Sequence, residues 1–149
     1  MAKKSITPHI VCDTSVFINY LRKAEPTVNA VEKLGHQNVI MPIISALELC
    51  KGAGDKRELK EIQEFINCYT SLQLNSKGVE LALELIKKYH LAHNLGLADA
   101  LIAASVIVAD LQLFTFNVKD FDFITGLKLY YPPNLSKIKR KRKGPEDLT

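Results

Sequence analysis

The hydrophobic positions along the chain alternate between two spacings. Short runs of consecutive apolar residues, as at residues 10–12 and 39–41, are bounded by polar or turn residues, which is typical of strands buried on both faces. Between these runs, apolar side chains recur every three or four residues, which is typical of amphipathic helices. Strands that alternate with helices indicate an α/β fold, so we predict a three-layer α/β/α sandwich around a central parallel sheet.

The same pattern predicts five strands, at residues 10–12, 39–41, 72–74, 112–115 and 127–130. Thr14 or Ser15 is expected to cap the first helix, and Ser45 opens the helix that follows the second strand. Ser76 is expected to cap a long helix that buries a face running through Val79, Leu83 and Ile86. A nearly all-apolar helix over residues 97–109 is expected to be central rather than peripheral.

The charge is concentrated at one end of the chain. The chain has 149 residues and a net charge of +4. All of this charge arises within residues 137–149, which contain six basic and two acidic residues. We therefore predict one folded domain over residues 1–134 and a basic, disordered tail over residues 135–149. No apolar run is long enough for a membrane span, and the N-terminus does not resemble a secretory signal, so we expect a cytoplasmic protein.

Four acidic residues stand in apolar settings. Asp13 ends the first apolar run, Glu48 lies in Ser-Ala-Leu-Glu-Leu, Asp99 is the only charge between residues 95 and 108, and Asp120 precedes Phe121. Burying carboxylates is costly unless something neutralises them, and a hard cation such as Mg²⁺, held by carboxylate oxygens and water, is suited to that. The three scattered cysteines and four scattered histidines do not have the spacing of a zinc site.

The predicted fold places these acids near one another. Ligands of open α/β sheets collect beyond the carboxyl ends of the strands. Asp13 follows the first strand directly, and Asn117 and Asp120 follow the fourth. Glu48 and Asp99 lie on helices that can reach the same edge, so we expect Asp13, Glu48 and Asp99 to converge within one coordination sphere.

Four sequence motifs resemble those of the PIN-domain family, and more narrowly of the VapC-like ribonuclease toxins of toxin–antitoxin pairs. They are DTSVFINYL from residue 13, SALEL from 45, LGLADALIAAS from 95 and TFNVKDF from 115, in the family's order. The resemblance covers residues 9 to about 131 and implies an endoribonuclease that needs Mg²⁺ or Mn²⁺ to hydrolyse RNA phosphodiester bonds.

Carried over position by position, Asp13, Glu48 and Asp99 match the family's metal-binding acids, and Ser15 matches its small hydroxyl residue. Many members have an acid where this chain has Asn117, and Asp120 is a plausible substitute three residues later. The resemblance thus implies a catalytic set of these six residues, of which the four acids bind metal. Ser15 either positions water or phosphate or only caps its helix, and Asn117 is either part of the site or a turn residue.

The resemblance also implies a small VapB-like antitoxin as a partner. We expect a homodimer, since the amphipathic stretches Asp55–Tyr69 and Ser76–Leu91 carry apolar residues beyond the needs of one core, Tyr69 and Tyr89 especially. Two other functions are considered: a housekeeping RNA-processing PIN nuclease, and a catalytically silent PIN scaffold that binds RNA or protein. The basic tail either attracts RNA or serves only as a solvated end.

Overall fold

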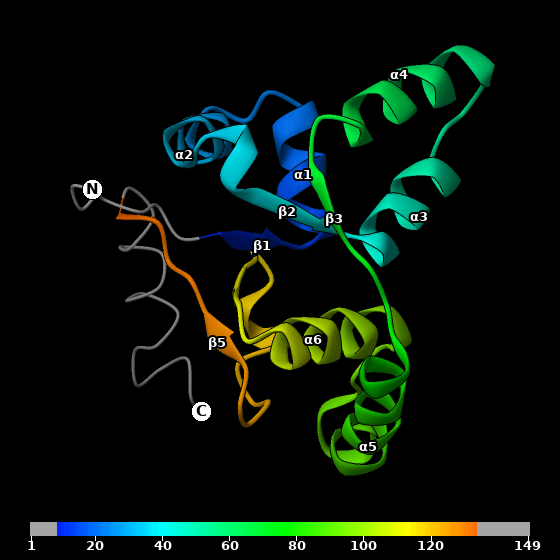
Figure 1. The fold of residues 1–149 in the computed structure, drawn as a ribbon, viewed down its shortest axis with the longest axis vertical. Coiled ribbons are helices and arrows are strands. Elements are labelled where there is room, and N and C mark those ends of the chain that lie inside the picture. Colours follow the sequence, from blue (N-terminus) through cyan, green and yellow to red (C-terminus); the bar gives the residue numbers. More distant parts are fainter. Residues whose placement is uncertain (1–8, 134–149) are drawn as a thin grey trace, which may run out of the picture.

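The computed structural model describes residues 9–133, so the predicted tail lies outside the described residues. Five parallel strands form one sheet in the order β3-β2-β1-β4-β5 (Figure 1). The predicted parallel sheet is therefore confirmed. The strands are β1 Ile10–Cys12, β2 Val39–Pro42, β3 Thr70–Leu72, β4 Gln112–Phe114 and β5 Lys128–Leu129.

Helices cover both faces of this sheet, which confirms the predicted three layers (Figure 1). They are α1 Thr14–Leu21, α2 Glu25–Leu34, α3 Ile43–Lys51, α4 Lys56–Ile66, α5 Ser76–His93 and α6 Leu97–Ala109, with short 3-10 turns η1 His36–Asn38 and η2 Val118–Asp120. None of the helices in the described part of the chain is both long and apolar enough to cross a bilayer.

Two hydrophobic cores lie on opposite sides of the sheet because successive side chains of a strand point to opposite faces. In β1, Ile10 and Cys12 face a core built with α1, α2 and α3, whereas Val11 faces a core built with α5 and α6. Ile40 and Leu113 join Val11 on the second side. Burial on both faces explains why these strands are continuous apolar runs in the sequence.

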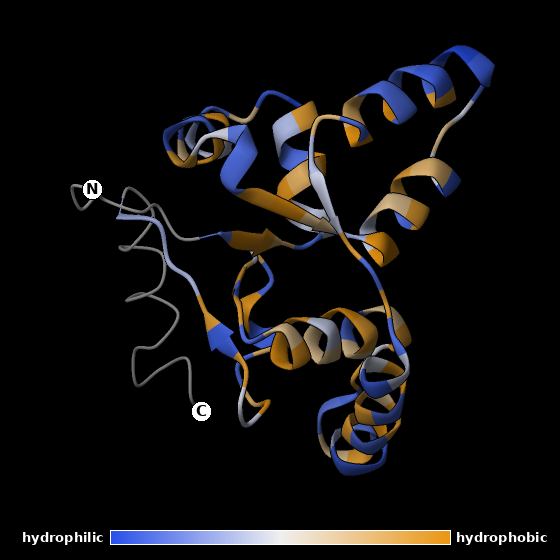
Figure 2. Ribbon diagram, in the orientation of Figure 1, coloured by the Kyte–Doolittle hydropathy of each residue, from blue (hydrophilic) through white to orange (hydrophobic). Residues whose placement is uncertain are grey.

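Helix α6 is central, as its composition predicts. Figure 2 shows it as mainly hydrophobic, and six of its thirteen residues are buried. The predicted buried face of α5 was wrong, because Val79 and Leu83 are 50% and 54% exposed. The buried residues of this helix are Gly78, Ala82, Leu85 and Tyr89. A Cβ on Gly78 would lie 3.9 Å from Ser105 Oγ of α6, so small residues let the two helices approach closely.

Three local expectations also need correction. Strand β3 covers residues 70–72 rather than 72–74, because Ile40 pairs with Thr70 and Pro42 with Leu72. Helix α3 begins at Ile43, directly after Pro42, rather than at Ser45. The caps of α1 and α5 are Asp13 and Asn75, whose side chains accept backbone N–H groups, so neither Thr14, Ser15 nor Ser76 has that role.

Candidate active site

The segments that carry the four acids meet the same edge of the sheet. Strands β2, β1 and β4 are neighbours, and the chain leaves their carboxyl ends into α3, Asp13 and the loop before η2. The C-terminal end of α6, at Asp110, leads into the start of β4. The first turn of α6, which contains Asp99, therefore lies at the other end of the helix, towards the carboxyl ends of the strands. This edge is where open α/β sheets bind ligands.

The Asp13 carboxylate is held by three hydrogen bonds, and the residue is only 3% exposed. Its Oδ1 accepts hydrogen bonds from the Ser15 hydroxyl at 2.6 Å and from Val16 N at 3.3 Å. Its Oδ2 accepts one from the Thr115 hydroxyl at 2.6 Å, and its backbone N donates to Phe114 O. Burial raises the pKa of this carboxyl, and the hydrogen bonds to its oxygens partly offset that.

The two hydroxyls also tie Asp13 to the loop after β4. Ser15 Oγ accepts a hydrogen bond from Phe116 N at 3.3 Å, and Thr115 Oγ1 accepts one from Asn117 N at 2.9 Å. Each hydroxyl therefore accepts a loop N–H and donates its own hydrogen to Asp13. Residues about a hundred positions apart in the sequence are thus fixed around one carboxylate.

Glu48 is exposed, and its partner is a hydroxyl rather than a cation. The Thr14 hydroxyl donates to Glu48 Oε1 at 2.5 Å and lies 2.9 Å from the hydroxyl oxygen of the fully buried Ser45. A carboxylate only accepts and Thr14 has one hydroxyl hydrogen, so the Ser45 hydroxyl donates to Thr14. This short chain of hydrogen bonds links α1 to α3 and orients the Glu48 carboxylate.

Asp99 has a different environment, because its surroundings are negative. Its pKa is raised to about 7, first by burial and then by the charges of Asp120, Asp13 and Glu48. Asp99 stands in the first turn of α6, where the helix dipole favours a negative charge, and this does not compensate for the burial. The charges of Asp120, Asp13 and Glu48 therefore all act on the Asp99 carboxyl.

The expectation that three acids share one coordination sphere was wrong for this structure. Among residues 9–133, no group of three or more His, Cys, Asp or Glu side chains is close enough to hold one metal ion. The hydrogen bonds explain this, since Asp13 is directed to Ser15 and Thr115, and Glu48 to Thr14. Mutual repulsion further keeps uncompensated carboxylates apart.

The donor set nevertheless has the chemistry of a Mg²⁺ or Mn²⁺ site. All four acids offer hard oxygen ligands, and the ion pairs found between residues 9 and 133, Lys87–Glu84 and Lys128–Asp110, involve none of them. Mg²⁺ keeps several waters and is often held by only one or two carboxylates, so a group of three is not required. The residues therefore fit such an ion.

The remaining predicted residues occupy the same edge. Ser15 does not cap α1 but donates to Asp13, as described above. Asn117 and Asp120 are exposed, and the Asn117 side chain does not cap η2, although Asp120 N donates to Asn117 O. The sequence predicted no role at the site for Thr115, and it predicted for Thr14 and Ser45 only that they begin helices. Two features of the sequence could have indicated a role at the site: Thr14 directly follows Asp13, and Thr115 directly follows the end of β4.

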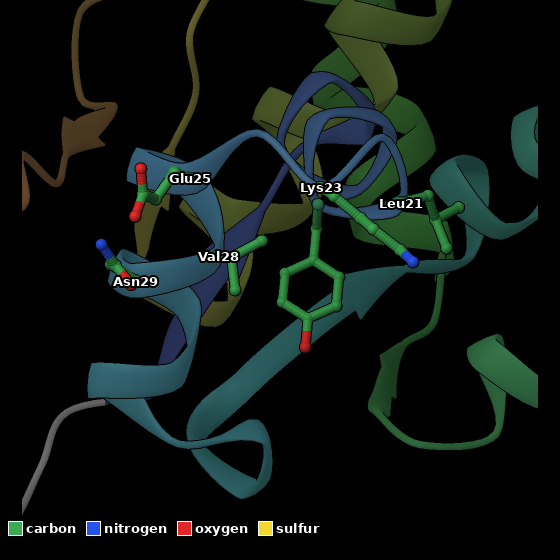
Figure 3. A pocket seen from close by; sticks show the side chains of 6 residues that line it. Leu21, Lys23, Glu25, Val28 and Asn29 are labelled. Carbon is green, nitrogen blue, oxygen red and sulfur yellow. The ribbon is translucent and has the colours of Figure 1, made fainter.

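The chain also has a surface hollow of about 730 Å³ where α1 turns into α2. Polar and apolar side chains line this hollow (Figure 3), and none of them is one of the four acids of the edge. The lining residues are Tyr20, Leu21, Lys23, Glu25, Val28 and Asn29. The hydrogen bonds of Tyr20, to Glu32 and His36, do not reach the acids. The chemistry of the chain is therefore assigned to the acidic edge.

Comparison with known proteins agrees with this geometry. The family model of the PIN domain matches residues 10–125. Ribonuclease VapC10 of Mycobacterium tuberculosis is 30% identical over 123 residues, which cover 80% of this chain and 90% of that protein. The structure of VapBC-1 from nontypeable Haemophilus influenzae is similar at a TM-score of 0.66 and 26% identity, covering 81% of this chain and 96% of that chain.

A toxin–antitoxin complex from Klebsiella pneumoniae has the same fold, with a TM-score of 0.67 at 23% identity, covering 79% of this chain and 94% of that chain. The family model extends from β1 to the residues after η2 and so includes every element that carries an acid of the site. With the sheet order, the acidic edge and these matches in agreement, the chain belongs to the PIN-domain family.

Proposed function

We propose that this protein is an endoribonuclease that hydrolyses RNA phosphodiester bonds at the acidic edge and acts in the cytoplasm as the toxin of a VapBC-like pair. One observation carries the proposal: within residues 9–133, four carboxylates from separate elements lie at one edge of the sheet and take part in neither ion pair, and burial together with the charges of the other three raises the pKa of Asp99 to about 7. A protein does not gain stability from such repulsion, so the arrangement favours a role in binding cations. The similarity to Ribonuclease VapC10 supports RNA as the substrate.

The residues that would hold Mg²⁺ or Mn²⁺ are Asp13, Glu48, Asp99 and Asp120. When bound, such an ion supplies an activated water and neutralises charge on the phosphate. The charge of the chain's own residues explains why it is needed, because four carboxylates alone repel a phosphate. Ser15 and Thr115 hold both oxygens of Asp13, and Thr14 holds one oxygen of Glu48. These hydroxyls orient the ligands before any ion arrives.

The test is cleavage of purified total RNA with Mg²⁺, with Mn²⁺ and with a chelator. We expect cleavage with either ion, none with the chelator, and none with Asp99→Asn under any condition. Asp110→Asn is the matched control, because Asp110 stands at the other end of α6 in a left-handed conformation that Asn tolerates. Cleavage by Asp99→Asn at the wild-type rate, or none by the wild type with either ion, would contradict the proposal.

We also propose a VapB-like antitoxin as a partner, since VapBC-1 and the Klebsiella pneumoniae complex are among the structural relatives. Co-expression of the chain with a small protein encoded beside it tests this. A stable complex that suppresses cleavage is expected. A housekeeping nuclease would instead be recovered without such a partner and would be tolerated by the cell when expressed alone. A silent scaffold would not cleave RNA at all.

The proposed homodimer rests on one of the two expected stretches, Ser76–Leu91, but not on the tyrosines. Tyr69 and Tyr89 are buried, so they do not form an interface. Val79 and Leu83 are exposed one turn apart on α5, and Leu91 on the same helix is 94% exposed. We expect Leu83→Glu to convert a dimer into a monomer in light scattering, whereas Leu47→Glu on α3 leaves it dimeric. A wild-type protein that is monomeric at micromolar concentration would contradict the dimer.

A further inference from the structure

A stack of aromatic rings lies beside the acidic edge. The imidazole of His93 is parallel to the Phe123 ring, with centroids 4.0 Å apart and an angle of 2°. Tyr89 packs against Phe123 with centroids 5.2 Å apart. Burial decreases along this stack, because Tyr89 is buried, Phe123 is half-buried and His93 is exposed. His93 is therefore the ring of the three that is most open to solvent.

Hydrogen bonds hold the Tyr89 ring and the end of α5 in place. The Tyr89 hydroxyl donates to Thr125 Oγ1 at 3.3 Å and accepts from Thr125 N at 3.1 Å. His93 is the last residue of α5, and the next residue, Asn94, ends the helix in a left-handed conformation with a hydrogen bond from its N to His90 O. The stack is thus held by a helix end on one side and a loop on the other.

This stack is continuous with the acidic site. The segment from α5 into α6 runs beside the segment after η2, since Tyr89 meets Thr125, His93 meets Phe123, and the charge of Asp120 acts on Asp99. Phe123 is only three residues from Asp120, so their Cα atoms are within about 11 Å of each other. An RNA strand several nucleotides long can therefore contact both Asp120 and the stack.

The charges around the stack suit a polyanion. Lys88 Nζ lies 5.3 Å from the centre of the Tyr89 ring, and Lys119 is exposed immediately before Asp120. The acidic residue Asp122 is also exposed in the loop, between Phe121 and Phe123. Cations beside an open aromatic face are the combination that single-stranded nucleic acid binds.

We propose that the His93–Phe123 stack is a platform for one nucleobase of the RNA, next to the phosphate that the acidic edge cleaves. The base lies against the outer face of His93, while the backbone passes between Lys88 and Lys119 towards the acids. Stacking accepts any base, because every base has a π-face, so the platform fixes the position of the strand more than its sequence. This inference rests on the proposed ribonuclease function.

The first experiment measures cleavage of a single-stranded RNA that the wild-type protein cuts at a mapped position. We expect His93→Ala to raise KM about tenfold, in line with the loss of one stacked base, with little change in kcat at saturating RNA. His93→Phe keeps an aromatic face and is expected to stay within about twofold of the wild type. His90→Ala is the control from the same exposed helix end.

The second experiment uses the wild-type protein, so it does not depend on the folding of a variant. An abasic residue replaces one base at a time on either side of the mapped cleavage position. One abasic position should raise KM about tenfold for the wild type and change nothing further for His93→Ala, because the same interaction has already been removed. A role of His93 in stability alone would change thermal unfolding and leave the abasic series unaffected, which would overturn the platform.

The outcomes separate the two proposals. If the wild type cleaves RNA while His93→Ala and every abasic position leave KM unchanged, the platform is overturned and the ribonuclease function stands. Equal losses for His93→Ala and His93→Phe would also overturn it, since a stacking interaction tolerates the change to Phe. If the wild type neither binds nor cleaves RNA, both proposals fail together.

Discussion

Asp13 and Asp99 stand at the same edge of the sheet, and their surroundings are opposite in kind. Asp13 is almost fully buried and accepts hydrogen bonds from Ser15, Thr115 and a backbone N–H. Asp99 is half-buried, and its carboxyl is influenced mainly by burial and by three neighbouring negative charges. Both pKa values are raised, but only Asp13 has donors that lower its pKa again.

This difference indicates that the two parts of the site have different roles. The Asp13 half is preformed, because hydrogen bonds from two elements fix its carboxylate whatever else is bound. The Asp99 half is destabilised by like charge, so it gains most when a cation binds. The edge therefore combines one carboxylate that is held rigidly with one whose charge state depends on what occupies the edge.

The largest effect should come from the Asp99 half. Asp99→Asn is expected to reduce RNA cleavage by about 10³-fold or more, since a catalytic metal contributes several kcal/mol to the transition state. Single-turnover cleavage at saturating RNA measures this. Asp110→Asn, at the other end of α6, should keep wild-type activity. Similar losses in both variants would show that the effect arises from α6 itself and not from the site.

The Asp13 half is tested by removing one hydrogen-bond donor. Thr115→Val leaves Asp13 Oδ2 and Asn117 N without a partner, so we expect a decrease of about 1–3 kcal/mol in the free energy of unfolding. Cleavage should fall about 10- to 100-fold, as for other residues that orient metal ligands. Thr115→Ser keeps the hydroxyl and should restore most of both. Full activity in Thr115→Val would contradict the preformed half.

The third test compares the stability of the two halves as the pH changes. The folded-state pKa of Asp99, about 7, exceeds the unfolded value of about 4, so the folded state binds more protons between these values. Stability of the metal-free protein should therefore fall as the pH rises from about 4 to 7. Asp99→Asn should raise the melting temperature at pH 8 by a few degrees. This corresponds to an increase of about 1 kcal/mol in the free energy of unfolding, once screening of the charges by water is included.

That increase should become small at about pH 4, where Asp99 is protonated in the folded state and about half protonated in the unfolded state. It should also shrink when Mg²⁺ is added to the wild type. Asp110→Asn is expected to behave in the opposite way, because Lys128 lowers the pKa of Asp110 and stabilises its charged form. Thermal unfolding with a chelator present gives both comparisons. An increase for Asp99→Asn that is equal at both pH values would rule out charge repulsion as its cause.

The smallest effect on chemistry is expected for the basic tail. Deleting residues 137–149 removes six basic residues that lie outside both halves of the site. RNA affinity should decrease, and the slope of log affinity against log salt should fall by about 0.7 for each phosphate that the tail no longer neutralises. Cleavage at saturating RNA should not change. A decrease in saturated cleavage would show that the site needs residues beyond the two halves.

The order of strands and helices could be predicted because each element leaves a local signal. Consecutive apolar residues marked β1 and β2, and the bounds of α6 matched the apolar stretch from Leu97 to Ala109. The edge strand β3 was misplaced by two residues, since its residues are exposed or half-buried and its register depends on pairing with β2. The buried face of α5 was also wrong, because large residues at helical spacing occur on both sides of that helix.

Local sequence patterns were enough to show which acids follow strands or open an apolar helix, and hence that they lie at one edge of a parallel sheet. How each acid is held depends on tertiary contacts. Asp13 and Thr115 are 102 residues apart, and no local pattern indicates that one donates to the other. The same holds for the stack of His93 on Phe123. Periodicity reports the environment of an element, whereas hydrogen bonds and ring contacts depend on where two elements meet.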